Sequence, residues 1–113
     1  MKNVIMLVLV SFFGIAAQAQ EKSKNAKYTF EVNGNCEQCK KRIEKAAYAV
    51  SGVKMAVWNI ETRQLNVILN EEKTLVSEVK KAIAKVGHDT DEFKATDDDY
   101  TNLHHCCQYE RKP

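Results

Sequence analysis

The sequence has few of the residues that interrupt regular structure, with four glycines and one proline, Pro113, among 113 residues. It also lacks a long hydrophobic run, because the apolar stretch over residues 4–14 is shorter than the roughly 18–20 residues that span a bilayer. Its charge is nearly balanced, with 17 basic and 15 acidic residues, so it has no basic surplus of the kind that binds nucleic acid. These absences argue against a membrane-spanning protein, a nucleic-acid-binding protein and, for so short a chain, a large multidomain enzyme.

The first 19 residues predict a secretory signal peptide. Lys2 supplies the positive start, residues 4–14 form the short apolar segment, and residues 17–19 provide an A-x-A cleavage site. We therefore expect a periplasmic or secreted protein that makes no direct membrane insertion after cleavage near Ala19. Residues 20–26 are polar and predict a flexible lead-in.

Alternating apolar residues predict three strands, at residues 27–32, 53–60 and 65–69. The second and third strands form a hairpin, because residues 61–63 are a short turn-like connection. A fourth strand is predicted around residues 90–94, although Phe93 is the only apolar residue in it.

Apolar residues at helical spacing predict two amphipathic helices. The first begins at Cys39 and is closed by Gly52, and the second has Thr74 as its N-cap and is closed by Gly87. The acidic segment at residues 96–99 predicts the start of a short third helix. That helix has one side lined by Tyr100, Leu103 or His104, and Cys107.

The order β-α-β-β-α-β predicts an α+β fold, a ferredoxin-like sandwich of an antiparallel sheet and two helices, with a short C-terminal helical extension. The sandwich covers residues 27–95 and the extension residues 96–113, whose last three residues we expect to be solvated. Many functions share this fold, so it does not decide the function.

The chemistry is concentrated in the C-x-x-C motif formed by Cys36 and Cys39. A gap of two residues lets both sulfurs point at one centre, and a helix N-terminus next to Cys39 favours the thiolate form. Thiolates are soft ligands that suit Cu(I), or Zn(II) with further ligands. The alternatives are a disulfide-closed pair or a thiol-disulfide redox pair.

In this setting the chain resembles the heavy-metal-associated (HMA) domain family of copper chaperones, mercury-binding periplasmic proteins and N-terminal domains of metal-pumping ATPases. The motifs that carry the resemblance are Val-Asn-Gly-Asn-Cys-Glu-Gln-Cys at 32–39, Arg-Ile-Glu-Lys-Ala at 42–46, Ser-Gly-Val at 51–53 and Ile-Ala-Lys-Val-Gly-His at 83–88. The resemblance implies that Cys36 and Cys39 bind one soft metal ion, Cu(I) first and Hg(II) or Zn(II) next, and pass it on by stepwise thiolate exchange. It also implies a metal-exporting P-type ATPase or efflux component as the partner, and a monomer or a metal-bridged dimer.

The chain departs from the family pattern in three places. Gly34 stands where the family usually has a methionine that braces the loop, which predicts a more mobile loop. His88 stands where the family often has tyrosine or lysine, so it is either a third metal ligand or an ordinary loop histidine. The third departure is the extension, which ends in His104, His105, Cys106 and Cys107.

The extension places four potential ligands in consecutive positions. Adjacent cysteines pair poorly with each other, so Cys106 and Cys107 are candidates for a second partner group. Either they join the C-x-x-C motif around one metal ion, with His104 or His105 as a further ligand, or they form disulfides with it in an oxidising compartment.

The remaining marked residues have simpler interpretations beside the functional ones. Trp58 and Tyr28 are expected in the core or on the sheet. The basic run at residues 40–42 is either a solvated helix face or a surface that steers an acidic partner.

We therefore expect an exported soft-metal chaperone or scavenger, a binding protein and not an enzyme. A thiol-disulfide oxidoreductase is a weaker interpretation, because the sequence has no proline that could face the motif as in thioredoxin-like enzymes. A disulfide-stapled interaction module is the remaining alternative.

Overall fold

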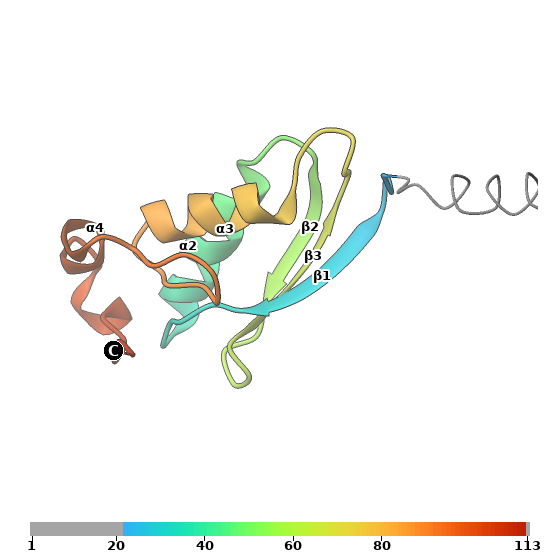
Figure 1. Ribbon diagram of the computed structural model, residues 1–113. Coiled ribbons are helices and arrows are strands. Elements are labelled where there is room, and N and C mark those ends of the chain that lie inside the picture. Colours follow the sequence, from blue (N-terminus) through green and yellow to red (C-terminus); the bar gives the residue numbers. More distant parts are fainter. Residues whose placement is uncertain (1–21, 113) are drawn as a thin grey trace, which may run out of the picture.

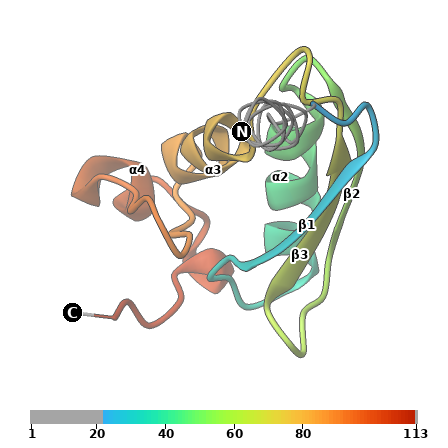
Figure 2. The same ribbon diagram turned by 45° about the vertical axis from the view of Figure 1, so that its right-hand side comes forward.

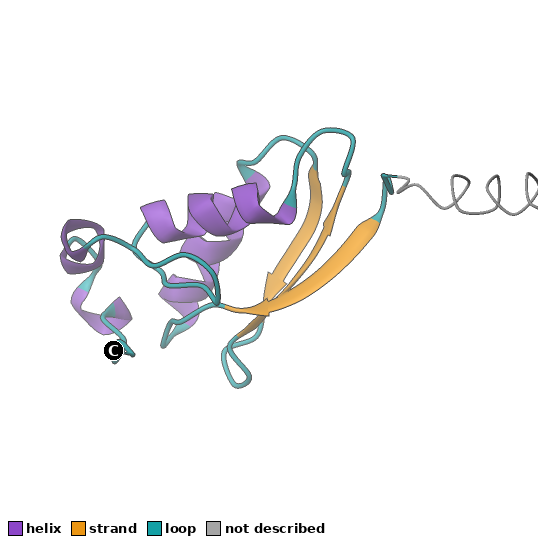
Figure 3. Ribbon diagram, viewed as in Figure 1, coloured by secondary structure: helices purple, strands orange, loops and turns teal. Residues whose placement is uncertain are grey.

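The computed structural model describes residues 22–112, so the predicted signal peptide lies outside the described residues. Three strands, β1 (Ala26–Glu31), β2 (Val53–Trp58) and β3 (Gln64–Leu69), form one antiparallel sheet in the order β1-β3-β2. Two helices, α2 (Glu37–Tyr48) and α3 (Val76–Lys85), cover one face of this sheet (Figures 1 and 3). The structure is an α+β ferredoxin-like sandwich, as the element order predicts.

The core lies between the sheet and the two helices. Along β3, residues Leu65, Val67 and Leu69 are buried, because alternate side chains of a strand point to the same face. Four residues of α2 at helical spacing meet them from above, namely Cys39, Ile43, Ala46 and Ala47. The metal motif is thus joined directly to the core, since Cys39 belongs to both.

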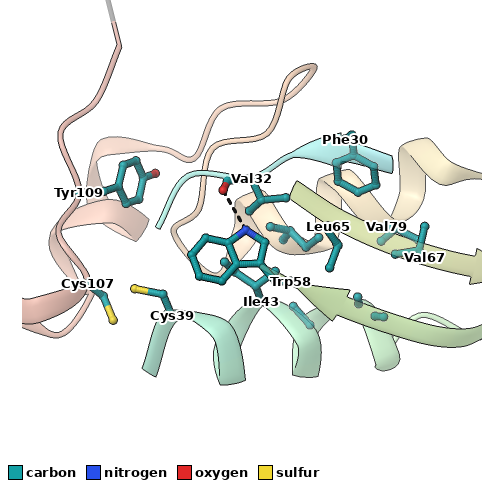
Figure 4. Packing of buried hydrophobic residues seen from close by; sticks show 14 of the residues in the cluster. Phe30, Val32, Cys39, Ile43, Trp58, Leu65, Val67, Val79, Cys107 and Tyr109 are labelled. Atoms are coloured by element: carbon teal, nitrogen blue, oxygen red, sulfur yellow. Dashed lines mark hydrogen bonds between the residues drawn. The ribbon is translucent and has the colours of Figure 1, made fainter. Parts of the chain in front are cut away.

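Trp58 closes the end of the core that lies nearest the metal motif. Its indole is 1% exposed, and its Nε1–H donates a hydrogen bond to the Val32 carbonyl at 3.0 Å (Figure 4). The prediction that Trp58 is a core residue is confirmed.

The start of α3 differs from the prediction by one residue. The N-cap is Leu75, and no side chain caps the helix. The Thr74 hydroxyl lies 3.4 Å from the Leu75 carbonyl, so the predicted N-cap role of Thr74 is wrong. A threonine caps a helix only when its oxygen reaches an N–H of the first turn, and here the chain enters the helix one residue later.

The predicted fourth strand is reduced to a single antiparallel bridge between Val32 and Thr90. The reason is local, because residues 90–93 close on themselves. The Thr90 N–H donates to the Phe93 carbonyl at 2.8 Å, and the Phe93 N–H donates to Thr90 Oγ1 at 2.9 Å. A turn therefore replaces the extended segment, and the bridge is made by Val32, the residue that follows β1.

The C-terminal extension folds back toward the start of α2. It contains α4 (Asp97–Thr101) and a 3-10 turn, η1 (His105–Cys107), in place of one continuous third helix. The Thr96 side chain accepts a hydrogen bond from the Asp99 N–H, which confirms the predicted helix start. In Figure 2 the extension lies beside the metal-loop end of the sandwich.

Candidate metal centre

The C-x-x-C motif lies where β1 leads into α2. Cys36 is the N-cap of the helix, with extended backbone, and Cys39 is in its first turn. The two sulfurs are 3.5 Å apart. The Asn35 N–H points at Cys39 Sγ at 3.4 Å, so the loop backbone already donates to one thiol. Cys39 is buried and Cys36 is half-buried, which leaves Cys36 as the more accessible entrance to the motif.

Gly34 packs tightly beneath the loop. A Cβ at this position would lie 3.0 Å from the Cys39 Cβ and 3.1 Å from the nearest atom of the Trp58 ring. The indole therefore takes the bracing place beside this loop, where the family pattern has a methionine side chain. The glycine accommodates that ring, and the greater mobility that we expect of this loop stays a prediction.

The extension brings Cys106 and Cys107 to the motif. Cys36 Sγ lies 3.7 Å from the sulfur of Cys106 and 3.5 Å from that of Cys107. The sulfurs of these three residues all lie within 4.8 Å of one another. Figure 4 shows Cys107 and Cys39 facing each other beneath Tyr109. Four thiols from distant parts of the sequence thus gather in one place, which we call the thiol cluster (Cys36, Cys39, Cys106, Cys107).

The four thiols differ in exposure, although all are free cysteines. Cys39 and Cys107 are fully buried, whereas Cys106 is exposed and donates to Gln38 Oε1 at 3.2 Å. The cluster is therefore open to solvent on the Cys106 side and closed on the side of the core.

The environment separates the pKa values of the thiols. Burial opposes ionisation of Cys36, but hydrogen bonds from the Cys39 N–H and from the surrounding thiols outweigh it and lower its pKa to about 7. Burial raises the pKa of Cys39 to about 12. The hydrogen bond to Cys36 raises the pKa of Cys106 to about 11. Cys36 therefore ionises more readily than Cys39 and Cys106, and the thiolate is the form that attacks and binds metals.

The sandwich matches the model of a known protein family. The model of the heavy-metal-associated domain matches residues 29–89, which is more than half of the chain. The chain belongs to the heavy-metal-associated domain family.

Individual HMA relatives agree with this assignment. The copper chaperone CopZ of Staphylococcus aureus is 36% identical over 55 residues, which cover 49% of this chain and 81% of the relative. Oxidized MerP from Ralstonia metallidurans CH34 is 33% identical, with a TM-score of 0.56, over 58% of this chain and 93% of that one. The N-terminal domain of a potential copper-translocating P-type ATPase from Bacillus subtilis, in its Cu(I)-loaded state, is 31% identical, with a TM-score of 0.56, over 58% and 84%.

The HMA match ends at residue 89, before the extension begins. Cys106 and Cys107 therefore lie outside the part that the family model describes. No helix within residues 22–112 is long and apolar enough to cross a membrane.

His88, a candidate third ligand, is placed beside the loop but not in the thiol cluster. It is fully buried; its Nδ1 lies 2.8 Å from the Asn33 carbonyl oxygen, and its ring stacks on Tyr109. Its Nε2 is buried without a hydrogen-bond partner. Burial lowers the pKa of His88 to about 4, so the ring is neutral at ordinary pH and donates from Nδ1 to the Asn33 carbonyl.

His104 and His105 lie at the start of η1 and are both exposed. The mutually close set of potential metal ligands among the described residues consists of Cys36, Cys106 and Cys107, so it contains neither of them and also omits His88 and Cys39. A metal role for the histidines stays a prediction, whereas the geometry gathers the sulfurs.

The sequence pattern missed the residues that hold the extension in place. Residues 111–113 were expected to be solvated, but Arg111 is half-buried and bonds both carboxylate oxygens of the buried Asp89. Tyr109 is 1% exposed. Its position in the sequence was the one signal that the extension packs on the sandwich, because a large aromatic side chain in a polar segment favours a buried place. Pro113 lies outside the described residues.

The basic run is divided between two roles. Lys40 forms an ion pair with Glu44 and donates to the Trp58 carbonyl, so it belongs to the scaffold. Lys41 and Arg42 instead line an open groove of about 600 Å³ along α2, together with Gln38, Lys45, Ala46, Ala49 and Val86.

Proposed function

We propose that this HMA protein is an exported carrier or scavenger of Cu(I) that holds the ion in the thiol cluster. Cys36 and Cys39 are the primary ligands, and Cys106 and Cys107 are additional thiolate ligands supplied by the extension. The metal is cargo in this proposal, and the protein is not an enzyme.

The observation that carries the proposal is the spacing of the sulfurs. A metal–sulfur bond of about 2.3 Å puts two thiolates on the same ion no more than about 4.6 Å apart. The sulfurs of Cys36, Cys106 and Cys107 lie 3.5–3.9 Å from one another, so one ion can reach all three as they stand. Cys39 Sγ lies 3.5 Å from Cys36 Sγ but falls outside this mutually close set, so a small shift of the loop would bring it to the same ion. A group of soft thiolates without a hard oxygen ligand favours a soft ion.

The relatives support Cu(I) as the first choice of metal. The CopZ relative is named a copper chaperone, and the ATPase domain was solved in its Cu(I)-loaded state. The similarity to MerP makes Hg(II) the second candidate. Zn(II) is the third, because a cluster of four thiolates suits its tetrahedral coordination.

Export and partner choice complete the proposal. The signal-peptide pattern at residues 1–19 supports a periplasmic or secreted protein cleaved near Ala19. The similarity to a P-type ATPase domain supports a metal-exporting ATPase or efflux component as partner. The basic groove beside Lys41 and Arg42 favours an acidic docking surface on that partner.

The test is an anaerobic titration of residues 20–113 with Cu(I) against a competing chelator. The wild type is compared with two double variants, Cys36→Ser/Cys39→Ser and Cys106→Ser/Cys107→Ser. We expect one tightly bound ion in the wild type, loss of tight binding in the first double variant, and weaker binding in the second. Serine is the matched replacement, because it keeps the size of the side chain but not the soft sulfur.

Two results would contradict the proposal. If the first double variant binds as tightly as the wild type, the C-x-x-C motif is not the metal site. If the second double variant binds like the wild type, the cysteines of the extension are not ligands. If the protein without metal catalyses the reduction of insulin, the thiol-disulfide alternative is favoured instead.

A further inference from the structure

We propose that Asp89, Tyr109 and Arg111 form a latch, defined by these three residues, that positions the cysteines of the extension and controls how fast the bound metal is released. This inference rests on the proposed function for its metal-release part only. The latch itself consists of contacts between protein atoms and is testable without metal.

The first half of the latch is Tyr109. Its hydroxyl donates to the Gly87 carbonyl at 2.9 Å and accepts a hydrogen bond from the Asp89 N–H at 2.8 Å. The ring is 1% exposed and stacks on His88. One side chain of the extension is thus bonded to the turn that follows α3, within the HMA-matched part of the chain.

The second half is the ion pair of Arg111 with Asp89. Nε of Arg111 lies 3.1 Å from one carboxylate oxygen of Asp89, and Nη2 lies 2.9 Å from the other. Such two-pronged pairs fix orientation as well as distance. Asp89 is 3% exposed and also accepts from the Ala95 N–H at 2.7 Å, so its carboxylate depends on these partners for compensation of its burial.

The thiols sit between two anchored points of the chain. On the N-terminal side, Leu103 is 6% exposed and packs so closely against Gly87 that a Cβ there would lie 2.7 Å from a Leu103 methyl carbon. On the C-terminal side the latch begins at Tyr109, two residues after Cys107. Cys106 and Cys107 therefore cannot leave the C-x-x-C motif unless one of the two anchors opens.

This arrangement has a consequence for metal transfer. When a thiolate acceptor takes the ion, each metal–sulfur bond to the protein is replaced by one to the acceptor, and the ion keeps its charge. An acceptor can approach the exposed Cys106, but Cys39 and Cys107 are buried, so it reaches the metal bonds of these two thiols only when the extension lifts. The latch makes opening of the extension a step in release, which suits a protein that retains its cargo until a partner engages it.

The experiment compares the wild type with Arg111→Met, Tyr109→Phe and Asp97→Asn. Asp97→Asn is the matched control: this carboxylate is 99% exposed and bonds Arg111 Nη1, so its replacement removes a solvent-exposed contact of the same arginine and leaves both bonds to Asp89 in place. Tyr109→Phe removes both hydroxyl hydrogen bonds and keeps the ring, so it provides a folded test if Arg111→Met fails to fold. Arg111→Lys keeps the positive charge but not the two-pronged geometry, so we expect its effect to lie between those of the wild type and Arg111→Met.

The first readout is the alkylation rate of each cysteine in the reduced, metal-free protein, followed by mass spectrometry. Cys106 is exposed and should react at a similar rate in every variant, whereas Cys107 is fully buried and should react slowly in the wild type and in Asp97→Asn. We expect Cys107 to react about tenfold faster or more in Arg111→Met and Tyr109→Phe. An unchanged Cys107 rate in both variants overturns the latch.

The second readout is the rate at which an excess of chelator removes Cu(I) from the loaded protein. We expect release about tenfold faster in the latch variants and unchanged in Asp97→Asn. If Cys107 becomes reactive but release stays at the wild-type rate, the latch exists and does not control release. If the wild type binds no Cu(I), the proposed function fails, and the alkylation result still decides the latch.

Discussion

Acidification should destabilise the folded protein through His88. In the unfolded chain this imidazole has its ordinary pKa of 6.5, whereas in the folded protein burial lowers the pKa to about 4, against the opposing effect of the hydrogen bond to the Asn33 carbonyl. Between these two values the unfolded chain binds a proton that the folded protein does not bind. The free energy of unfolding therefore rises with pH across this window and falls as the solution is acidified.

The size of the effect follows from the width of the window. Each pH unit inside it changes the free energy of unfolding by up to about 1.4 kcal/mol. The contribution of the buried, neutral His88 is therefore nearly complete above pH 6.5, and about 2 kcal/mol of it is lost by pH 5. Near pH 4 the loss reaches about 3 kcal/mol, and further acidification adds little from this group.

The assay is urea unfolding of the reduced, metal-free protein at several pH values between 6.5 and 4, for the wild type and His88→Gln. Glutamine does not titrate but can still donate to the Asn33 carbonyl, and all other titrating groups are shared, so the difference between the two proteins isolates His88. We expect the wild type to lose about 2 kcal/mol more than the variant between pH 6.5 and 5. Equal pH dependence in the two proteins would refute the reasoning.

Three further predictions follow from the contacts around the loop and from the signal pattern. Gly34→Ala should lower the free energy of unfolding by about 1–3 kcal/mol, because its Cβ would meet Cys39 and the Trp58 ring at 3.0–3.2 Å; a variant as stable as the wild type in urea would contradict this. Trp58→Phe should cost about 2–4 kcal/mol in the same assay, since it shrinks a buried ring and leaves the Val32 carbonyl unpaired; a loss below about 0.5 kcal/mol would argue against the role of Trp58 as the brace. Exported protein should begin at Gln20, and an intact mass that retains residues 1–19 would rule out the cleavage site.

The parts of the fold that could be predicted are those that a local periodicity of apolar residues indicates. The alternation of Leu65, Val67 and Leu69 marks one strand face, and the spacing of Cys39 and Ile43 marks a helix that begins beside the metal motif. Such patterns depend on neighbouring residues alone, so the β-α-β-β-α order and the location of the C-x-x-C motif followed from them.

The parts that escaped prediction depend on contacts between distant residues or on competition within a short segment. Nothing in the sequence pairs Arg111 with Asp89, because a single ion pair has no periodicity. Thr90 has the β-branched shape of a strand residue, yet its hydroxyl closes a turn with Phe93, and this local hydrogen bond competes with strand pairing. The convergence of Cys106 and Cys107 on the motif was left open for the same reason, since it depends on how the extension folds back.

The most direct test of the central claim is the number of sulfur atoms around bound Cu(I), counted by X-ray absorption spectroscopy on the anaerobically loaded protein. The account predicts three or more sulfur ligands in the wild type and two in Cys106→Ser/Cys107→Ser. Two sulfur ligands in both proteins would contradict it, because the extension would then lie beside the metal without binding it.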